Sequence, residues 1–215
     1  MADPLEGLDA VPWSELEHAY GSAEDVPEQL RALAGPDPQE RGRAQWALYG
    51  NLWHQGIVYS ASPHAVPFLL RLLEAASYAD RAWVLGYLYE LAGGTSYLDA
   101  HKDLTFYDGQ RETPEFKAQL EAELRAVAAT RAAVSEGRAI FERLLSEPAI
   151  GVAAAAARLL ARVNGEGLDA DAQEALYNAI EAAEGRLDDE GDREGRLALT
   201  RAQAWLDGQL EGEAP

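Results

Sequence analysis

The sequence predicts an all-α protein, an α-α superhelix of the solenoid kind with one irregular insertion. Three observations lead to this class. A motif of apolar residues, proline and arginine recurs after 40 positions, apolar residues elsewhere follow helical spacing, and almost no segment alternates as a strand does. Of the 215 residues, 47% are hydrophobic, which is enough to build a core.

The repeat is clearest between residues 26–33 (VPEQLRAL) and 66–73 (VPFLLRLL), which match at valine, proline, leucine and arginine. The same displacement continues into the next segment and pairs Arg41 with Arg81, Ala44 with Val84 and Leu48 with Leu88. A third copy, displaced by a further 72 positions, keeps the apolar character at Ile140, Leu144, Leu145, Ala156 and Leu160. Units of about 40 residues with two helices each are typical of α-solenoids, in which neighbouring pairs stack.

Capping residues and apolar spacing together set the expected helix boundaries. Ser14 to Glu17 has capping-box spacing, Gly35 to Pro38 reads as the turn inside the first pair, and Thr113-Pro114 resembles a helix start. We expect helices at residues 13–20, 24–34, 37–55, 63–75, 78–92, 114–134, 136–146, 148–163, 170–184 and 192–209. The remaining expectations are one domain over 1–215, a packed loop insertion at 93–112 and a frayed tail at 211–215.

The charge balance restricts the class of partner. The chain has 18 Lys and Arg against 37 Asp and Glu, a formal net charge of −19. Nucleic acids and anionic lipids need a basic surface, so we expect no nucleic acid and no membrane as partner, and a basic protein instead. The chain has no cysteine, no secretory signal and no apolar window long enough to span a bilayer, and we therefore expect a cytoplasmic location.

These segments resemble HEAT-repeat proteins. The family's paired-helix unit has an apolar-Pro opening, here Val26-Pro27 and Val66-Pro67, an Asp-Pro turn, here Asp37-Pro38, and an early arginine in the second helix, here Arg41 and Arg81. More narrowly, the segment from Trp46 to Gly56, with Tyr59 and residues 65–69, resembles a group of uncharacterised bacterial HEAT-repeat proteins. The resemblance implies an armadillo-type fold and a curved binding scaffold, and it carries over no catalytic residues.

An aromatic and amide cluster at the end of the second expected helix is the first candidate site. It consists of Trp46, Tyr49, Asn51, Trp53, His54, Gln55 and Tyr59. Aromatic side chains with a polar group suit a recognition patch, so we take these residues as partner-binding candidates. Apolar residues at helical spacing more often belong to a core, which favours the alternative: a buried face of Trp46, Tyr49 and Trp53, with the amides bonded to the turn.

The insertion supplies the second set of partner-binding candidates, which are Asp99, His101, Asp103, Tyr107 and Asp108. One histidine among carboxylates is a chemically feasible metal set, but zinc sites usually draw several His or Cys ligands. We therefore predict no metal, no cofactor and a role as a contact loop or lid. Residues 188–194 alternate carboxylates but fail the EF-hand spacing, and residues 93–96 lack the lysine of a phosphate loop.

The sequence favours a non-enzymatic protein-binding scaffold with an acidic surface, for which an immunity or antitoxin protein is a concrete form. The alternative is a HEAT-like enzyme of the bilin-lyase or DNA-glycosylase type, and the net charge opposes the DNA-binding version. A third possibility is self-assembly through an exposed solenoid end, and the sequence leaves the oligomeric state open. No nucleophile elbow, metalloprotease helix or paired-acid motif supports catalysis.

Overall fold

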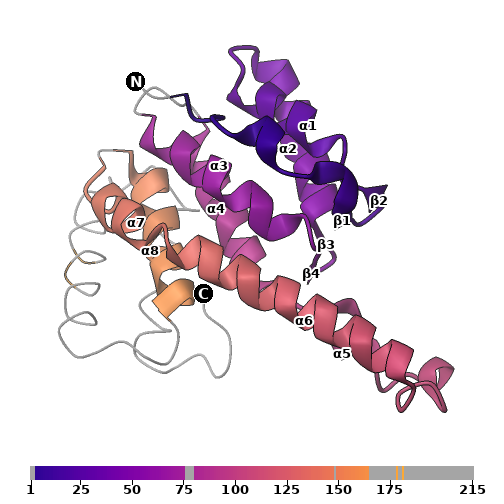
Figure 1. Ribbon diagram of the computed structural model, residues 1–215. Helices are drawn as coiled ribbons and strands as arrows, with labels where there is room; N and C mark the ends of the chain where they lie inside the picture. Colours follow the sequence, from indigo (N-terminus) through magenta and orange to yellow (C-terminus); the bar gives the residue numbers. More distant parts are fainter. Residues whose placement is uncertain (1–2, 76–79, 148, 165–177, 179–180, 182–215) are drawn as a thin grey trace. The chain divides into compact units, whose positions relative to one another are not determined.

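The chain divides into two compact units, each described here by itself. The structure is a computed structural model that describes residues 3–75, 80–147, 149–164, 178 and 181. Unit 1 comprises Met1–Ala75 and Glu90–Val134, and unit 2 comprises Ala76–Tyr89 and Ser135–Pro215. The described residues are mostly helical, which confirms the all-α class (Figure 1). The expectation of one domain over the whole chain stays a prediction.

Unit 1 holds most of the elements. Its helices are α1 (Val26–Ala34), α2 (Pro38–Leu52), α3 (Ser62–Glu74), α5 (Tyr97–His101) and α6 (Pro114–Ser135), the last of which ends one residue beyond the unit. Its strands form two hairpins, β1 (Glu17–His18) with β2 (Gly21–Ser22), and β3 (Trp53–His54) with β4 (Ile57–Val58). Short 3₁₀ turns lie at Leu8–Ala10, Trp13–Glu15 and Thr105–Tyr107.

Unit 2 contains most of α4 (Arg81–Gly93), together with α7 (Arg138–Leu144) and α8 (Ile150–Asn164), and α7 packs against α8. Arg81 forms an ion pair with Glu147 at 2.8 Å. The Tyr89 ring carries two guanidinium groups, from Arg158 at 3.8 Å and from Arg162 at 3.7 Å. Arginine on a tyrosine face is a favourable cation–π contact, so these residues tie α8 to α4.

The first and third copies of the expected repeat coincide with packed helix pairs, α1 with α2 and α7 with α8. The second helix of the first pair begins where predicted, because the Asp37 side chain accepts a hydrogen bond from the Gln39 amide at 2.8 Å. The repeat arginine has a local function there, since Arg41 donates to the carbonyls of Gly35 and Pro36 at 3.2 and 2.8 Å. The core positions Leu48, Leu88 and Leu160 of the three copies are all buried.

The two hairpins are joined to the helices by backbone bonds. The loop of the second hairpin is Gln55-Gly56, with φ of 53° and 87°, as the favoured two-residue turn requires. Thr95, just past α4, donates from its amide to the Gly56 carbonyl at 2.8 Å and accepts from the Val58 amide at 3.1 Å. A Cβ at Gly94 would lie 2.3 Å from a Val58 methyl carbon, so only glycine permits this approach.

Several expected boundaries are wrong. The helix expected at 13–20 is a 3₁₀ turn followed by the first hairpin, and the helix expected at 37–55 ends at Leu52, where the second hairpin begins. The insertion at 93–112 contains the short helix α5 and a 3₁₀ turn, although no helix was expected there. Of the helix expected at 170–184 only residues 178 and 181 are described, and both are helical, whereas the helix expected at 192–209 and the tail at 211–215 lie outside the described residues. Every helix in the described part is too short or too polar to traverse a bilayer.

Replacing Leu48 by alanine tests the core position of the repeat. Leu48 is fully buried, so we expect Leu48→Ala to lower the free energy of unfolding by about 2–5 kcal/mol in urea denaturation. Leu124→Ala on α6 is the matched control, because Leu124 is exposed and its loss is expected to cost less than about 0.5 kcal/mol. Equal losses for the two variants would contradict the assigned core.

Candidate functional site

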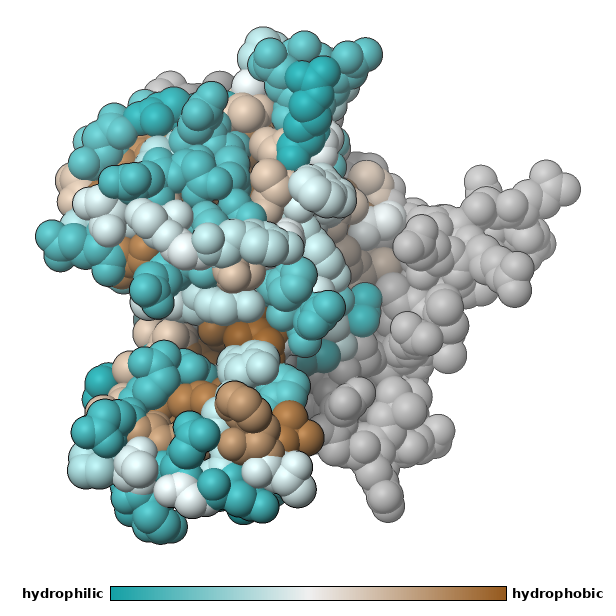
Figure 2. Space-filling view, turned by 90° about the vertical axis from the view of Figure 1, so that its right-hand side faces the viewer, coloured by the Kyte–Doolittle hydropathy of each residue, from teal (hydrophilic) through white to brown (hydrophobic). Residues whose placement is uncertain are grey.

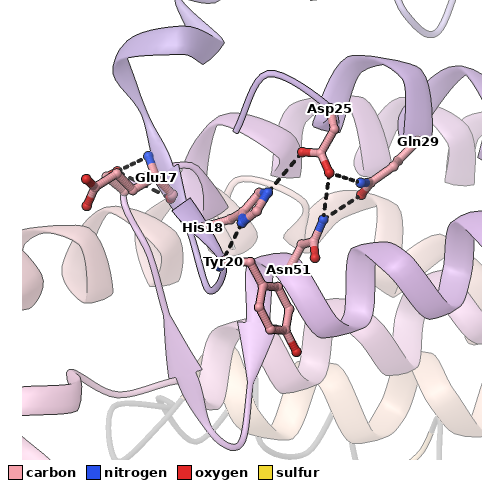
Figure 3. Close-up of polar contacts among 7 residues, drawn as sticks. Glu17, His18, Tyr20, Asp25, Gln29 and Asn51 are labelled. Atoms are coloured by element: carbon pink, nitrogen blue, oxygen red, sulfur yellow. Dashed lines mark hydrogen bonds and ion pairs between the residues drawn. The ribbon is translucent and has the colours of Figure 1, made fainter. Parts of the chain in front are cut away.

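A polar network that includes the buried side chains of His18 and Asn51 joins the first hairpin to α1 and α2 (Figure 3). His18, buried on β1, contacts an Asp25 carboxylate oxygen through Nε2 at 2.9 Å, and its Nδ1 accepts from the Tyr20 amide at 3.0 Å. The second Asp25 oxygen accepts from Gln29 at 2.7 Å and from Asn51 at 3.2 Å. We call His18, Asp25, Gln29 and Asn51 the hairpin network.

The hydrogen bonds of the hairpin network assign its members structural roles. Because His18 Nδ1 accepts from an amide, its proton is on Nε2 and points at Asp25, so both ring nitrogens are occupied. The Asn51 carbonyl accepts from the Ala19 amide at 2.9 Å, which fixes the hairpin loop to the end of α2. Asn51, expected to contact a partner, is buried, and its side chain is engaged within the chain.

The aromatic residues on α2 are not the buried face that helical spacing favours. The Trp46 side chain is 83% exposed and Tyr49 is 38% exposed, so the buried-face alternative is wrong for both. Tyr49 and Trp53 contact each other, with ring centroids 4.8 Å apart. The expectation that these rings bind a partner stays a prediction, but their exposure leaves them available for one.

The hairpin residues of the predicted cluster separate into three positions. His54 on β3 meets the Tyr20 ring edge-on at 5.4 Å, and Tyr20 is 69% exposed. Gln55 occupies the left-handed position of the turn, so its backbone conformation is set by the hairpin. Tyr59 is half-buried and lines a groove that the sequence did not reveal.

This groove has a volume of about 360 Å³ and lies within unit 1, between the hairpin segments, α5 and α6. Its apolar lining consists of Ile57, Val58, Ala122 and Ala126, and its aromatic lining of Tyr59 and Tyr97. Its polar lining consists of Glu17, His18, Ser60, Gln119 and Glu123. We call it the tyrosine groove. Figure 2 faces the side of the molecule where the hairpins and α5 lie, and hydrophobic surface is visible there in a hollow between mostly hydrophilic parts.

The Glu123 carboxylate is held in place by hydrogen bonds from the start of α5. Its Oε2 accepts from the Ser96 hydroxyl at 2.7 Å and from the Leu98 amide at 2.9 Å. Its Oε1 accepts from the Gln119 side chain at 3.2 Å. Ser96 is fully buried, so the carboxylate is anchored to a rigid point of the fold.

The tyrosines near Glu123 have raised pKa values. Burial raises the pKa of the Tyr59 phenol above its ordinary value of 10.0, and the neighbouring Tyr20 and Glu123 raise it further. The pKa of Tyr107 is raised by desolvation and by Tyr97 and Glu123. Both shifts favour the neutral phenol, because an ionised phenolate is disfavoured beside another negative charge and away from water.

The predicted insertion residues mostly pair with neighbouring side chains. Asp99 binds Lys102 at 2.8 Å, His101 bonds the Tyr97 carbonyl at 2.8 Å, and Asp108 binds Arg111 at 3.0 Å. Asp103 is exposed and lies 3.7 Å from Arg111. Tyr107 packs edge-on against Phe116 on α6. Within the described residues, no three His, Cys, Asp or Glu side chains gather closely enough to hold a metal ion.

Sequence reasoning found Tyr59 but missed Glu17, Tyr97 and Glu123. These residues come from a hairpin, a one-turn helix and a long helix that are distant in the sequence. One sequence signal could have indicated α5: Ser96 lies three residues before Asp99, the spacing at which an N-cap side chain accepts a hydrogen bond from a helix amide.

Comparison with known proteins gives no relative for this chain. No protein-family model matches it, and no curated protein and no solved structure is significantly similar.

Removing the Asp25 carboxylate tests the hairpin network. We expect Asp25→Ala to lower the free energy of unfolding by about 1–3 kcal/mol, because the buried His18 loses its hydrogen-bond partner. Asp25→Asn keeps one acceptor oxygen, so we expect it to lower the free energy of unfolding by less than Asp25→Ala does. Asp9→Ala removes an exposed ion pair with Arg31 and is expected to cost about 0–1 kcal/mol in the same urea denaturation. A loss for Asp25→Ala no larger than for Asp9→Ala would refute the network's structural role.

The titration of Tyr59 tests the geometry of the tyrosine groove. Because its pKa is raised in the folded state, the associated stability is complete below the ordinary pKa of 10.0 and is lost as pH rises through the folded value. We expect ¹³C NMR of labelled tyrosine to show that Tyr59, assigned with Tyr59→Phe, titrates at a pH above 10.0. Glu123→Gln should move this titration to lower pH, because it removes a neighbouring negative charge. The control is Glu121→Gln, an exposed residue on the same helix, which should leave the Tyr59 pKa unchanged. An unmoved pKa in Glu123→Gln would place the carboxylate away from the ring.

Proposed function

We propose that the chain is a non-enzymatic HEAT-like α-solenoid that binds a basic protein partner on an acidic surface. The observation that carries this proposal is that a chain of net charge −19 leaves several large aromatic side chains exposed. The exposed aromatic residues of unit 1 are Tyr20, Tyr49, Tyr97, Trp46 and Phe106.

The solenoid arrangement is supported by the agreement between the repeat and burial. Val26 and Val66 open corresponding helices and are both fully buried. Leu48, Leu88 and Leu160 are buried at the corresponding position of the second helix in each pair. A helix pair with one apolar face cannot bury that face by itself. When the same apolar face recurs in successive pairs, stacking the pairs in a row buries it.

The exposed aromatic residues support a binding role. Trp46 and Phe106 are 83% and 74% exposed, so most of each aromatic ring is accessible to a partner. Tryptophan and tyrosine are enriched among the residues that dominate binding energy, because each brings a large rigid area with a polar group. Tyr49 on α2 is in ring contact with Trp53 on β3, and Trp46 precedes Tyr49 by about one helical turn, so the three aromatic residues lie on neighbouring parts of unit 1.

The charge supports a basic partner. Carboxylates on the surface raise the rate at which a positively charged protein arrives, and they disfavour other acidic proteins. Neutralising a cationic nuclease, as an immunity or antitoxin protein does, is a concrete form of this function. A chain without cysteine also suits a reducing cytoplasm, where such a partner acts.

Affinity capture from extracts of the encoding organism tests this function. We expect the immobilised chain to retain a basic protein at about 0.05 M salt and to release it at about 0.5 M, because salt screens the surface charges. Trp46→Ala with Tyr49→Ala is expected to weaken binding of that purified protein about thirtyfold in calorimetry, as loss of a dominant contact does.

The control for this experiment is Leu124→Ala, an exposed apolar residue on α6, which should leave binding unchanged. The proposal fails if the retained proteins are not basic, or if the aromatic variant binds as tightly as the control.

A further inference from the structure

The tyrosine groove combines aromatic rings and carboxylates without a lysine or arginine side chain. Two tyrosines, Tyr59 and Tyr97, and two glutamates, Glu17 and Glu123, belong to its lining, and no lysine or arginine does. Within the described residues, neither glutamate forms an ion pair with a lysine or arginine. The groove therefore offers aromatic faces beside carboxylates whose charge no lysine or arginine of the described residues neutralises.

We propose that the tyrosine groove is the pocket in which the chain holds an arginine side chain of its basic protein partner, placed between Tyr97 and the Glu123 carboxylate. This inference rests on the proposed function and names the part of the partner that is recognised.

Glu123 has acceptor capacity left for a ligand. A carboxylate offers about four lone-pair sites, and the chain uses three of them. Two of the three bonds go to Oε2, so the free site is on Oε1. Ser96 and Leu98 hold the carboxylate through Oε2, so a guanidinium group would bind Oε1 without ordering the carboxylate first.

Arginine suits this groove better than lysine. Its planar guanidinium stacks on a tyrosine ring while it donates to a carboxylate, whereas an ammonium is a strongly hydrated point charge. Tyr97 is 47% exposed, and its ring already stacks on His101 at 4.4 Å, which holds the ring in one orientation. The stem of arginine would lie along Ile57 and Val58, which are apolar and buried.

The size and surroundings of the groove favour a side chain carried by a protein. Its volume of about 360 Å³ is larger than an arginine side chain, so the groove has room for that side chain together with neighbouring atoms of the partner. Tyr20, which contributes to the raised pKa of Tyr59, and Tyr107, near Tyr97, lie beside the groove. A larger molecule that inserts one arginine would cover these rings as well, whereas a free small cation would leave them exposed.

The experiment is an NMR titration of ¹⁵N-labelled full-length protein with a capped Gly-Arg-Gly-Arg-Gly peptide at about 0.15 M salt, where the screening length is about 8 Å. We expect shifts at the Gln119 side-chain amide and the Tyr97 amide, and no binding of the same peptide with citrulline in place of arginine. Glu123→Gln should raise the dissociation constant about tenfold, and Tyr97→Leu about threefold.

The matched control is Glu121→Gln, which removes the same charge from the exposed part of α6 and should change the dissociation constant less than twofold. The inference is overturned if the arginine peptide does not bind, or if Glu123→Gln and Glu121→Gln weaken it equally. It is also overturned if free argininamide binds as tightly as the peptide, which would indicate a small-cation site. None of these outcomes alters the salt-dependent capture of a basic protein, so the two proposals fail separately.

Discussion

The pairing of Thr95 with the second hairpin is the constraint on which the candidate site depends. Two backbone hydrogen bonds, from Thr95 to Gly56 and from Val58 to Thr95, bind β4 to the segment between α4 and α5. Gly94 makes this approach feasible, because any side chain there would collide with Val58. Tyr59 directly follows β4 and Tyr97 follows Thr95 by two residues, so the same contact places both groove tyrosines.

The structural role of Glu123 and the recognition role proposed for it do not compete. It satisfies the amide of Leu98 and the hydroxyl of Ser96 at the start of α5, a helix too short to be stable without tertiary contacts. The same bonds orient the carboxylate toward the groove and immobilise it. A group fixed for folding is also preorganised for binding, which lowers the entropy lost when a ligand arrives.

The helices were readable from the sequence because their signal is periodic. Leu48 and Leu88 occupy corresponding positions in the apolar stripes of two helices. Each is buried, because a 3.6-residue period puts apolar residues on one side of a helix. The hairpins could not be predicted from periodicity, since strands of two residues are too short to show a period. The first hairpin therefore lies inside the segment 13–20 where a helix was expected. The one local indication of the second hairpin in the sequence is Gln55-Gly56, which forms its two-residue turn.

The candidate site was only partly readable, for a different reason. Trp46 has the spacing of a core residue, and sequence spacing does not tell which side of a helix meets other elements. Asn51 is a partner-binding candidate from the sequence, with bonding inside the chain as the alternative, and the structure shows Asp25 and Gln29 bound to its side chain in a buried position. Tyr59 was found because it lies near other aromatic residues. Glu123 could not be identified from the sequence, because the chain has 37 acidic residues and only the fold brings Ser96 to this one.

Net charge and the groove would contribute to recognition at different stages. The charge of −19 acts at distances comparable to the screening length, so it increases the rate of encounter with any basic protein and selects weakly among them. The groove acts at contact, where a stacked guanidinium must meet one carboxylate oxygen, and this requirement selects for shape as well as sign. An acidic surface without a groove would bind many basic proteins and release all of them with salt. The proposed contact of a guanidinium with Tyr97 and Glu123 would therefore add a discrimination among basic partners that net charge alone does not provide.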